Sequence, residues 1–139
     1  MRFWDSSAVV PLLLRQPQSP HARSFLEEDP DVVVWWGTPV ECASAFARLR
    51  REGLLAETHE AELARDLERL RRGWYEMLPG DHLRAQAMRI LRLHPLRSAD
   101  ALQLAAALEW AGSPPSGALV TFDERLAGAA EREGFEVVG

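Results

Sequence analysis

The sequence predicts an α/β fold, a three-layer α/β/α sandwich around a mostly parallel central sheet of about four or five strands. Three observations lead to this expectation. Short apolar runs typical of strands alternate along the chain with longer segments of helical periodicity. The run from Val32 to Trp36 is apolar throughout, as expected of a strand buried on both faces. The 139 residues are enough for one hydrophobic core, so we expect a single domain over residues 1–139.

Each expected element has its own signals in the sequence. Strands are expected at residues 2–5, 32–36, 74–78, 118–122 and 135–138, where β-branched and aromatic residues are concentrated. Helices are expected at residues 6–15, 20–28, 38–52, 58–72, 81–93, 98–110 and 124–133. Pro11 predicts a kink or a late start of the first helix. The helix over 98–110 is apolar almost all round, so we expect it to be the buried central helix.

Polar residues at the expected helix starts predict the N-caps. The predicted caps are Ser6, Ser7, Thr38, Thr58, Asp81 and Ser98. Around Thr38 the pattern extends further, because Pro39 suits the first position of a helix and Glu41 stands where a capping box places its acid.

The composition excludes several classes of chemistry. All sixteen basic residues are arginine, which excludes lysine-dependent enzymes such as P-loop NTPases, protein kinases and Schiff-base enzymes. Cys42 is the single cysteine, so an internal disulfide and a thiolate zinc site are excluded, and we expect this residue in the core. No stretch is apolar for long enough to span a bilayer and no signal segment is recognisable, so we expect a cytoplasmic protein.

Four acidic residues occupy comparable places in the expected fold. Asp5 and Asp123 each follow a strand, and Glu41 and Asp100 each lie in the first turn of a helix that follows a loop. Ligand sites of parallel sheets lie at the carboxyl ends of the strands, so we expect these four carboxylates to converge there. Packed together they repel one another unless divalent cations bind. Oxygen ligands without a Cys or His cluster favour Mg²⁺ or Mn²⁺ over zinc.

Each of these acids also has a purely structural explanation. Glu41 fits a capping box about as well as it fits a site, and Asp100 fits an acid that stabilises the start of a helix through its dipole. Asp5 and Asp123 fit turn or cap residues. The interpretation as a site therefore depends on the set of four and not on any one member.

Four segments resemble the motifs of PIN-domain ribonucleases, in the order in which that family has them. They are Asp5-Ser6-Ser7, Pro39-Val40-Glu41, the segment from Leu96 to Ala107, and the segment from Val120 to Leu126. The similarity covers essentially the whole chain, and its most specific parts surround Asp100 and Asp123. A chain of this size resembles in particular the VapC toxins of type II toxin–antitoxin modules.

The resemblance implies a Mg²⁺-dependent or Mn²⁺-dependent endoribonuclease that is often a homodimer and is held inactive by a cognate antitoxin. The catalytic and metal-binding residues that it implies are Asp5, Glu41, Asp100 and Asp123, with Thr121 in support. We expect Ser6 to cap a helix or orient a carboxylate. In this hypothesis Asp5 and Asp100 hold the main ion, and Glu41 and Asp123 position a second ion or the water that attacks the RNA phosphodiester.

RNA binding is expected to involve the basic middle of the chain. Residues 48–97 hold eleven arginines against eight acidic residues, although the net charge of the chain is −5. Candidates for phosphate contacts are Arg48, Arg50, Arg51, Arg89, Arg92 and Arg97. Helical ion pairs such as Arg48 with Glu52 explain these arginines equally well. Trp36 and Trp74 are candidates for stacking on a base and, alternatively, for the core.

An antitoxin groove is expected between early helices. The apolar residues of the first helix, and the leucines of the helix over 58–72, exceed what one buried stripe requires. We expect an amphipathic antitoxin segment to bind there. The resemblance to PIN-domain toxins also implies that an antitoxin arginine reaches the four acids. Core packing or a homodimer contact explains the same leucines equally well.

Two other functions compete with the toxin hypothesis. One is a PIN nuclease that acts in RNA processing, or on structured DNA, outside any toxin module. The other is a metal-binding interaction module without catalytic activity. A phosphatase of the haloacid dehalogenase type is disfavoured, because Asp5-Ser6-Ser7 lacks a second aspartate and the chain has no lysine.

Overall fold

The computed structural model describes all 139 residues and contains a five-stranded sheet with seven helices. The strands are β1 (Arg2–Trp4), β2 (Val32–Trp35), β3 (Tyr75–Met77), β4 (Ala118–Val120) and β5 (Glu136–Val138). The helices are α1 (Ser6–Leu13), α2 (Ser19–Glu28), α3 (Thr38–Arg51), α4 (Glu57–Arg71), α5 (Asp81–Leu93), α6 (Ser98–Ala111) and α7 (Glu124–Glu133). All neighbouring strands are parallel, in the order β3-β2-β1-β4-β5, which confirms the predicted fold class.

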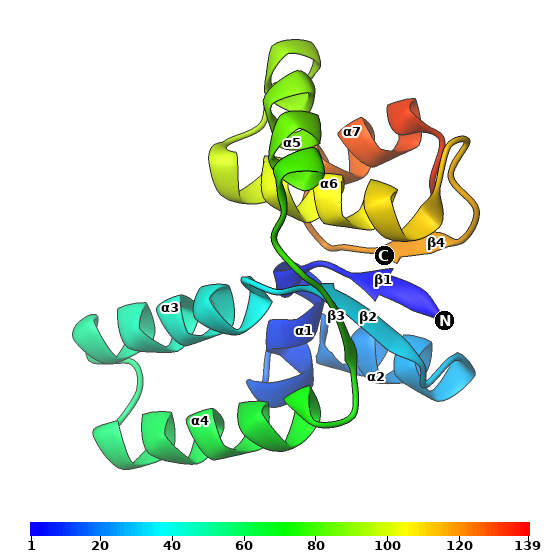
Figure 1. The fold of residues 1–139 in the computed structure, drawn as a ribbon. Coiled ribbons are helices and arrows are strands. Elements are labelled where there is room, and N and C mark those ends of the chain that lie inside the picture. The colour runs from blue at the N-terminus through cyan, green and yellow to red at the C-terminus, as the bar shows by residue number, and fades with distance from the viewer.

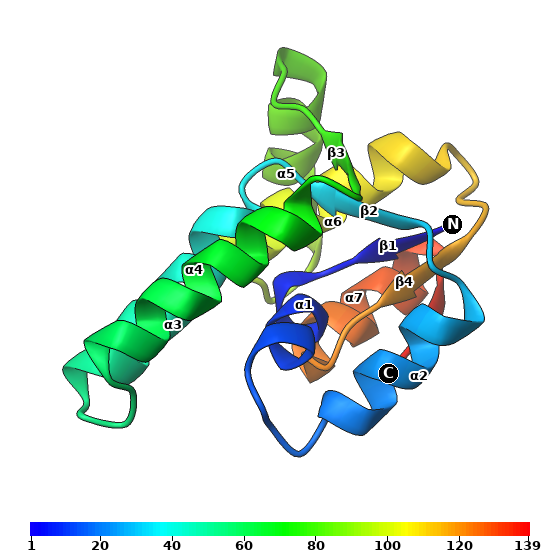
Figure 2. The same ribbon diagram turned by 90° about the horizontal axis from the view of Figure 1, so that it is seen from below.

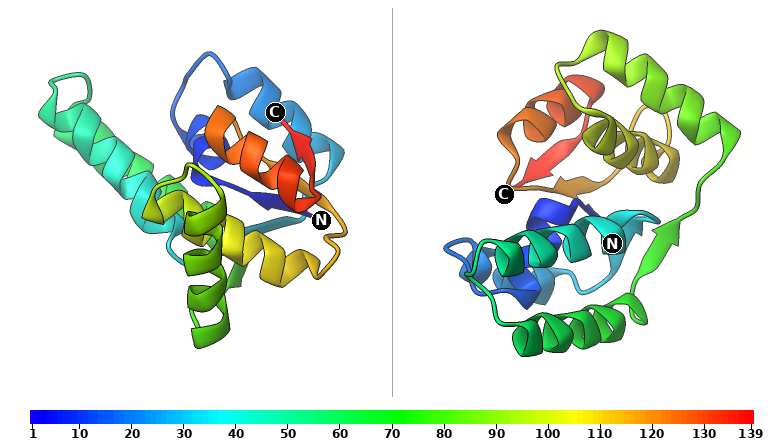
Figure 3. Two further views of the ribbon diagram at one scale, coloured as in Figure 1. Left: turned by 90° about the horizontal axis from the view of Figure 1, so that it is seen from above. Right: turned by 90° about the vertical axis from the view of Figure 1, so that its left-hand side faces the viewer.

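The sheet separates two layers of helices, with α5, α6 and α7 on one face and α1 to α4 on the other (Figure 1; Figure 3, right). Alternate residues of each strand point to opposite faces. Phe3 and Leu119 pack in the core beneath α5, α6 and α7, whereas Trp4 and Val120 pack in the core on the side of α1 to α4. All four residues of β2 are buried, as expected of a strand covered on both faces.

The strand order creates a switch point between β1 and β4. The connections from β1 through β2 to β3 contain α1 to α4, and those from β3 through β4 to β5 contain α5 to α7, so the chain winds outward on both sides of the pair β1–β4. Asp5 follows β1 and Thr121 follows β4, which places both at the crevice where open α/β sheets bind ligands.

Helices α3 and α4 form a long hairpin that extends beyond the sheet (Figures 1 and 2). Phe46 of α3 and Leu63 of α4 are buried in the core on this side. An ion pair between Arg50 Nε and Glu60 Oε1, at 2.8 Å, also joins the two helices. Arg50 thus pairs between helices, and the expected pair of Arg48 with Glu52 is not formed.

The helix starts correct the predicted caps. Thr38, Thr58, Asp81 and Ser98 lie inside their helices, whose N-caps are Gly37, Ala56, Gly80 and Arg97. Only two helices have a side-chain cap, and in both the cap is an acid that ends a strand or loop. Asp5 accepts a hydrogen bond from the Ser7 amide at 3.2 Å, and Asp123 accepts one from the Leu126 amide at 2.9 Å. The prediction of Ser6 or Ser7 as the cap was wrong, because the acid before them takes that position.

The first helix is shorter than predicted and its apolar residues are mostly core. It contains Pro11 and ends at Leu13, followed by extended backbone at Leu14. Val9 and Val10 are buried, and Leu13 packs partly buried against the same core. These contacts agree with the alternative explanation of the α1 residues as core, and a groove has to be sought elsewhere. No helix of the chain is long and apolar enough to cross a bilayer.

Replacement of Leu104 by alanine tests the central helix. Leu104 of α6 is fully buried, so Leu104→Ala should lower the free energy of unfolding by about 2–5 kcal/mol. Leu91→Ala, at an exposed position of α5, serves as the matched control and should change it by about 0.5 kcal/mol or less. Urea denaturation measures both values, and equal effects of the two substitutions would contradict the placement of α6 in the core.

Candidate active site

Four acids from four elements meet at the carboxyl edge of the sheet. Asp5 follows β1, Asp123 follows β4, and Glu41 and Asp100 lie in the first turns of α3 and α6. Thr121 bonds to the Asp5 carboxylate and to the Asp123 amide, Glu41 accepts a hydrogen bond from Ser6 beside Asp5, and Asp100 lines one cavity with Asp123. The structure thus brings together the four carboxylates that the sequence analysis selected.

Asp5 is the most buried of the four and is held by hydroxyl groups. Its Oδ2 accepts hydrogen bonds from Ser7 Oγ and, at 3.0 Å, from Thr121 Oγ1. Burial raises the pKa of Asp5, and these hydrogen bonds to the carboxylate oppose that rise. Because Thr121 follows β4, its bond to Asp5 also ties the ends of β1 and β4 together.

The same hydroxyls organise the segment between β4 and α7. The Phe122 amide donates to Ser7 Oγ at 2.9 Å, and the Asp123 amide donates to Thr121 Oγ1 at 3.0 Å. The Asp123 carboxylate then caps α7. The position of Asp123 is therefore coupled to that of Asp5 through two side chains.

Glu41 is held from both sides by neutral donors. Ser6 Oγ donates to its Oε1 at 3.2 Å, and Gln103 Nε2 donates to its Oε2 at 2.8 Å. The same Gln103 nitrogen donates to Thr38 Oγ1 at 3.1 Å, so the predicted capping box between Thr38 and Glu41 is not formed. Burial is the largest cause that raises the pKa of Glu41, to about 7, and the negative charge of Asp5 adds to it.

Asp100 lies half-buried at the start of α6. Burial, followed by the charges of Asp123 and Asp5, raises its pKa to about 6. The positive charges of Arg97 and Arg125 act in the opposite direction. None of the four acids forms an ion pair with a basic side chain. Their mutual repulsion is therefore not neutralised by the chain itself.

The chemistry of this donor set fits a hard divalent cation. Asp5 and Glu41 are held by hydroxyl groups and the Gln103 amide, and the four acids offer carboxylate oxygens, which Mg²⁺ and Mn²⁺ prefer. As the side chains stand, no three Asp, Glu, His or Cys groups are arranged to hold one ion together. Burial, to which the charge of neighbouring carboxylates adds, raises the pKa of Asp5, Glu41 and Asp100, and a cation bound beside them would favour their ionised forms.

The six arginines predicted to bind phosphate lie in different surroundings. Arg97 precedes α6 and lines a cavity with Asp100 and Asp123. Two are engaged in ion pairs at 2.8 Å, Arg89 with Glu133 and Arg50 with Glu60. The other three, Arg48, Arg51 and Arg92, lie exposed on α3 and α5. Of the six, only Arg97 lines a cavity with the acids.

Ser7 and Gln103 hold acids of the candidate site, and the sequence analysis gave them no role there. Gln103 is a buried amide in an otherwise apolar helix, one turn after Asp100. A single polar residue in an apolar helix, on the same face as Asp100, is a signal in the sequence that could have identified Gln103. Ser7 had no signal that separates it from Ser6.

The two tryptophans named as candidates for stacking on a base differ in exposure. Trp74 is buried and donates a hydrogen bond to Glu76, whereas Trp36 is 52% exposed directly after β2. Trp36 therefore remains the one candidate of the two that a base can reach.

Comparisons with known proteins agree on one fold. The family model for the PIN domain matches residues 2–132. The structure of FitAcB from Neisseria gonorrhoeae has a TM-score of 0.70 at 19% identity and covers all of this chain and 97% of its own. A toxin–antitoxin complex from Klebsiella pneumoniae has a TM-score of 0.66 at 16% identity and covers 100% and 97%. PAE2754 from Pyrobaculum aerophilum has a TM-score of 0.69 at 21% identity and covers 99% and 88%. A comparison with curated protein sequences gave no match.

The raised pKa of Glu41 predicts a dependence of stability on pH. A carboxyl whose pKa is higher in the folded chain binds its proton more tightly there, so folding is favoured less as that proton is lost. In the presence of a chelator, the free energy of unfolding should fall as the pH rises from 4.5 to about 7. Chemical denaturation over this range measures the effect, and Glu41→Gln should flatten the profile. An identical profile for the variant would show that Glu41 titrates at its ordinary pKa.

Proposed function

The chain belongs to the PIN domain family, and on that basis we propose that it is a metal-dependent endoribonuclease, the toxin of a toxin–antitoxin pair. The observation that carries the proposal is the set of four carboxylates, mutually repelling and without ion pairs, at the switch point of the sheet. A nuclease needs positive charge beside its substrate phosphate, and this site concentrates oxygen ligands where a cation is required.

The proposed metal ligands are the four acids. Asp5 and Asp100 would hold the main Mg²⁺ or Mn²⁺, with Glu41 and Asp123 for a second ion or for the attacking water. Divalent cations at such sites lower the pKa of bound water and offset the charge that develops on phosphoryl oxygens. The chain itself supplies the fixed positions of the ligands, through Ser7 and Thr121 for Asp5 and through Ser6 and Gln103 for Glu41.

The toxin role is supported by the solved structures that this fold resembles. One of them is described as a toxin–antitoxin complex, and another related structure is FitAB bound to a DNA fragment. Matches at this level of identity establish the fold. From the toxin–antitoxin complex we infer that the partner of the present chain is a protein antitoxin. As substrate we propose single-stranded RNA, which the resemblance to PIN-domain ribonucleases implies.

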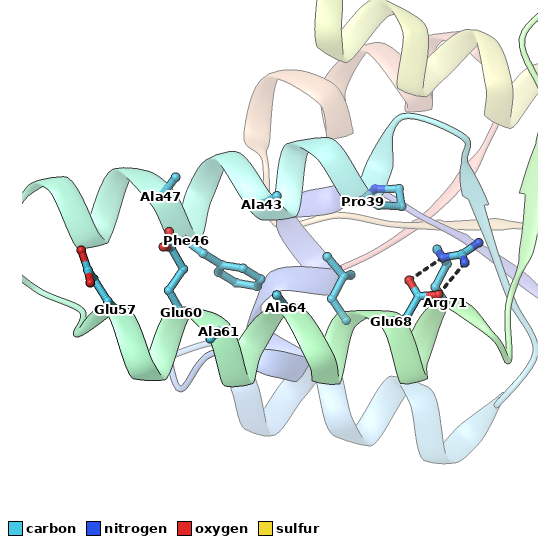
Figure 4. A pocket seen from close by; sticks show the side chains of 11 residues that line it. Pro39, Ala43, Phe46, Ala47, Glu57, Glu60, Ala61, Ala64, Glu68 and Arg71 are labelled. Atoms are coloured by element: carbon cyan, nitrogen blue, oxygen red, sulfur yellow. Dashed lines mark hydrogen bonds and ion pairs between the residues drawn. The ribbon is translucent and has the colours of Figure 1, made fainter.

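The proposed antitoxin site is the groove between α3 and α4, in place of the α1 face favoured by the sequence (Figure 4). This cavity of about 490 Å³ has an apolar floor of small residues and Phe46, with acidic residues along its rim. The lining residues are Pro39, Ala43, Phe46, Ala47, Glu57, Glu60, Ala61, Ala64, Leu67, Glu68 and Arg71. Glu41 lies in the first turn of α3, at the end of the helix nearer the sheet. A segment bound along this groove would therefore have one end near the four acids.

Replacement of Asp100 by asparagine tests the site. Asp100→Asn keeps the shape and removes the charge, so the fold should persist while RNA cleavage falls by about a hundredfold or more. Glu131→Gln removes an exposed acid of α7 outside the site and should leave cleavage unchanged. Cleavage of a labelled single-stranded RNA is measured for both variants, with circular dichroism as a check of folding. Cleavage by Asp100→Asn at the parent rate would remove Asp100 from the proposed machinery.

Metal binding should be visible without any measurement of activity. An ion that binds only the folded chain stabilises it, by about 2.7 kcal/mol at a hundred times its dissociation constant. Mg²⁺ or Mn²⁺ should therefore raise the melting temperature of the parent and of Glu131→Gln, but not of Asp5→Asn. Sodium chloride at equal ionic strength is the control for screening. An equal shift in Asp5→Asn would place the ion elsewhere.

The groove is tested by filling it. Ala64→Arg places a long charged side chain in the groove at an exposed helical position, and Glu62→Arg introduces the same side chain on α4 outside the lining. After co-expression with the product of the neighbouring gene, gel filtration should recover the complex for the parent and for Glu62→Arg but not for Ala64→Arg. A complex that survives in Ala64→Arg contradicts docking at this groove.

A further inference from the structure

A second feature of the acidic edge is a cavity that contains no apolar side chain. It measures about 490 Å³ and is lined by Arg97, Asp100, Asp123, Glu124 and Arg125. Two of these residues are the acids of the proposed metal site, so the cavity opens directly onto that site. The other side chains reach it from the starts of α6 and α7.

The two arginines of this cavity are free to bind a ligand. Arg97 and Arg125 are exposed, and neither side chain forms a hydrogen bond or an ion pair. Arg89, in contrast, is held by Gln86 and Glu133 on α5 and α7. Both free guanidinium groups lie near enough to Asp100 to lower the pKa of its carboxyl. They are therefore positive groups at the acidic site that no residue of the chain neutralises.

The start of α6 adds to the attraction for an anion. Arg97 is its N-cap residue, and no side chain caps the first turn of this 14-residue helix. Unpaired amides and the helix dipole make such an end favourable for a negative group. At α7, in contrast, the Asp123 carboxylate already accepts a hydrogen bond from the Leu126 amide of the first turn.

The charges of the cavity depend on a bound cation. Its three acids outweigh its two arginines by one negative charge, and one divalent cation would reverse that sign. An anion is then bound only together with the metal. Guanidinium groups donate pairs of hydrogen bonds that match the oxygens of a phosphate.

We propose that Arg97 and Arg125 form a phosphate subsite that holds a backbone phosphodiester of the substrate strand beside the proposed metal site. The inference rests on the proposed nuclease function and identifies which of the chain's many arginines bind substrate. Because the contact is made to the backbone, the subsite positions the strand without reading its sequence.

The test is a direct binding measurement. The probes are a fluorescein-labelled single-stranded RNA and a DNA of the same sequence, with Ca²⁺ as the divalent ion and a gel to verify that each stays intact. Fluorescence anisotropy is measured at several salt concentrations for the parent, Arg97→Gln, Arg125→Gln and the double variant. Arg132→Gln removes an unpaired exposed arginine of α7 outside the cavity and is the matched control.

Each single variant should bind RNA about tenfold more weakly, as expected for loss of a hydrogen bond to a charged group. The slope of log affinity against log salt should fall by about 1.4 in the double variant, since each single-strand phosphate contact contributes about 0.7. Arg132→Gln should match the parent. Parent affinity and parent slope in the double variant would overturn the subsite.

The same experiment separates this inference from the proposed function. If the parent binds DNA and RNA equally through the two arginines but cleaves no RNA in Mg²⁺, the subsite stands and the ribonuclease proposal fails. If the parent cleaves RNA and the double variant binds it like the parent, the ribonuclease proposal stands and the subsite fails.

Discussion

The hydrogen bonds that surround the Asp5 carboxylate are the interaction on which the site depends. Ser7 and Thr121 both donate to the same oxygen, and Thr121 comes from a strand that neighbours β1 in space but not in sequence. The two hydroxyls also accept the amides of Phe122 and Asp123. One buried acid thus fixes the start of α1, the junction of β1 with β4 and the loop that presents Asp123.

This arrangement leaves a cost that the chain does not offset by itself. Burial raises the pKa of Asp5, Glu41 and Asp100, and each of these acids is also repelled by another. Neutral donors hold Asp5 and Glu41, and the two arginines beside Asp100, Arg97 and Arg125, form no ion pair with any of the acids. The ionised forms of these acids are therefore unfavourable in the folded chain unless a positive group binds beside them.

Much of the fold was predictable from sequence because its signals are local. The apolar run of β2, the apolar surface of α6 and the acids after β1 and β4 all report burial or strand ends directly. The helix caps were not predictable, because Thr38 bonds to a residue 65 positions away and not to its own helix. The α1 residues were ambiguous for a related reason. Their apolar pattern does not tell whether α3, α4 or solvent lies opposite, and the structure shows core.

In the site, the positions of the four acids at the edge of the sheet were predictable from topology, and two of the side chains that hold them, Ser6 and Thr121, were named in advance. Gln103 was not, because it lies 62 residues from Glu41 and had no motif of its own.

The same limit applies to the arginines. Sequence alone offered six of them on equal terms, and only the fold shows that Arg89 is engaged elsewhere while Arg125 lies beside the acids.

The strand order also determines when during synthesis the site can exist. Asp5 and Thr121 are 116 residues apart, and β1 gains its neighbour β4 only after residues 118–120 have left the ribosome. A nascent or prematurely ended chain that contains Asp5, Glu41 and Asp100 still lacks the loop that completes the cluster. Such a chain leaves the apolar edge of β1 unpaired, which favours its removal by proteolysis. The acidic cluster is therefore absent from any chain that ends before β4 and Asp123.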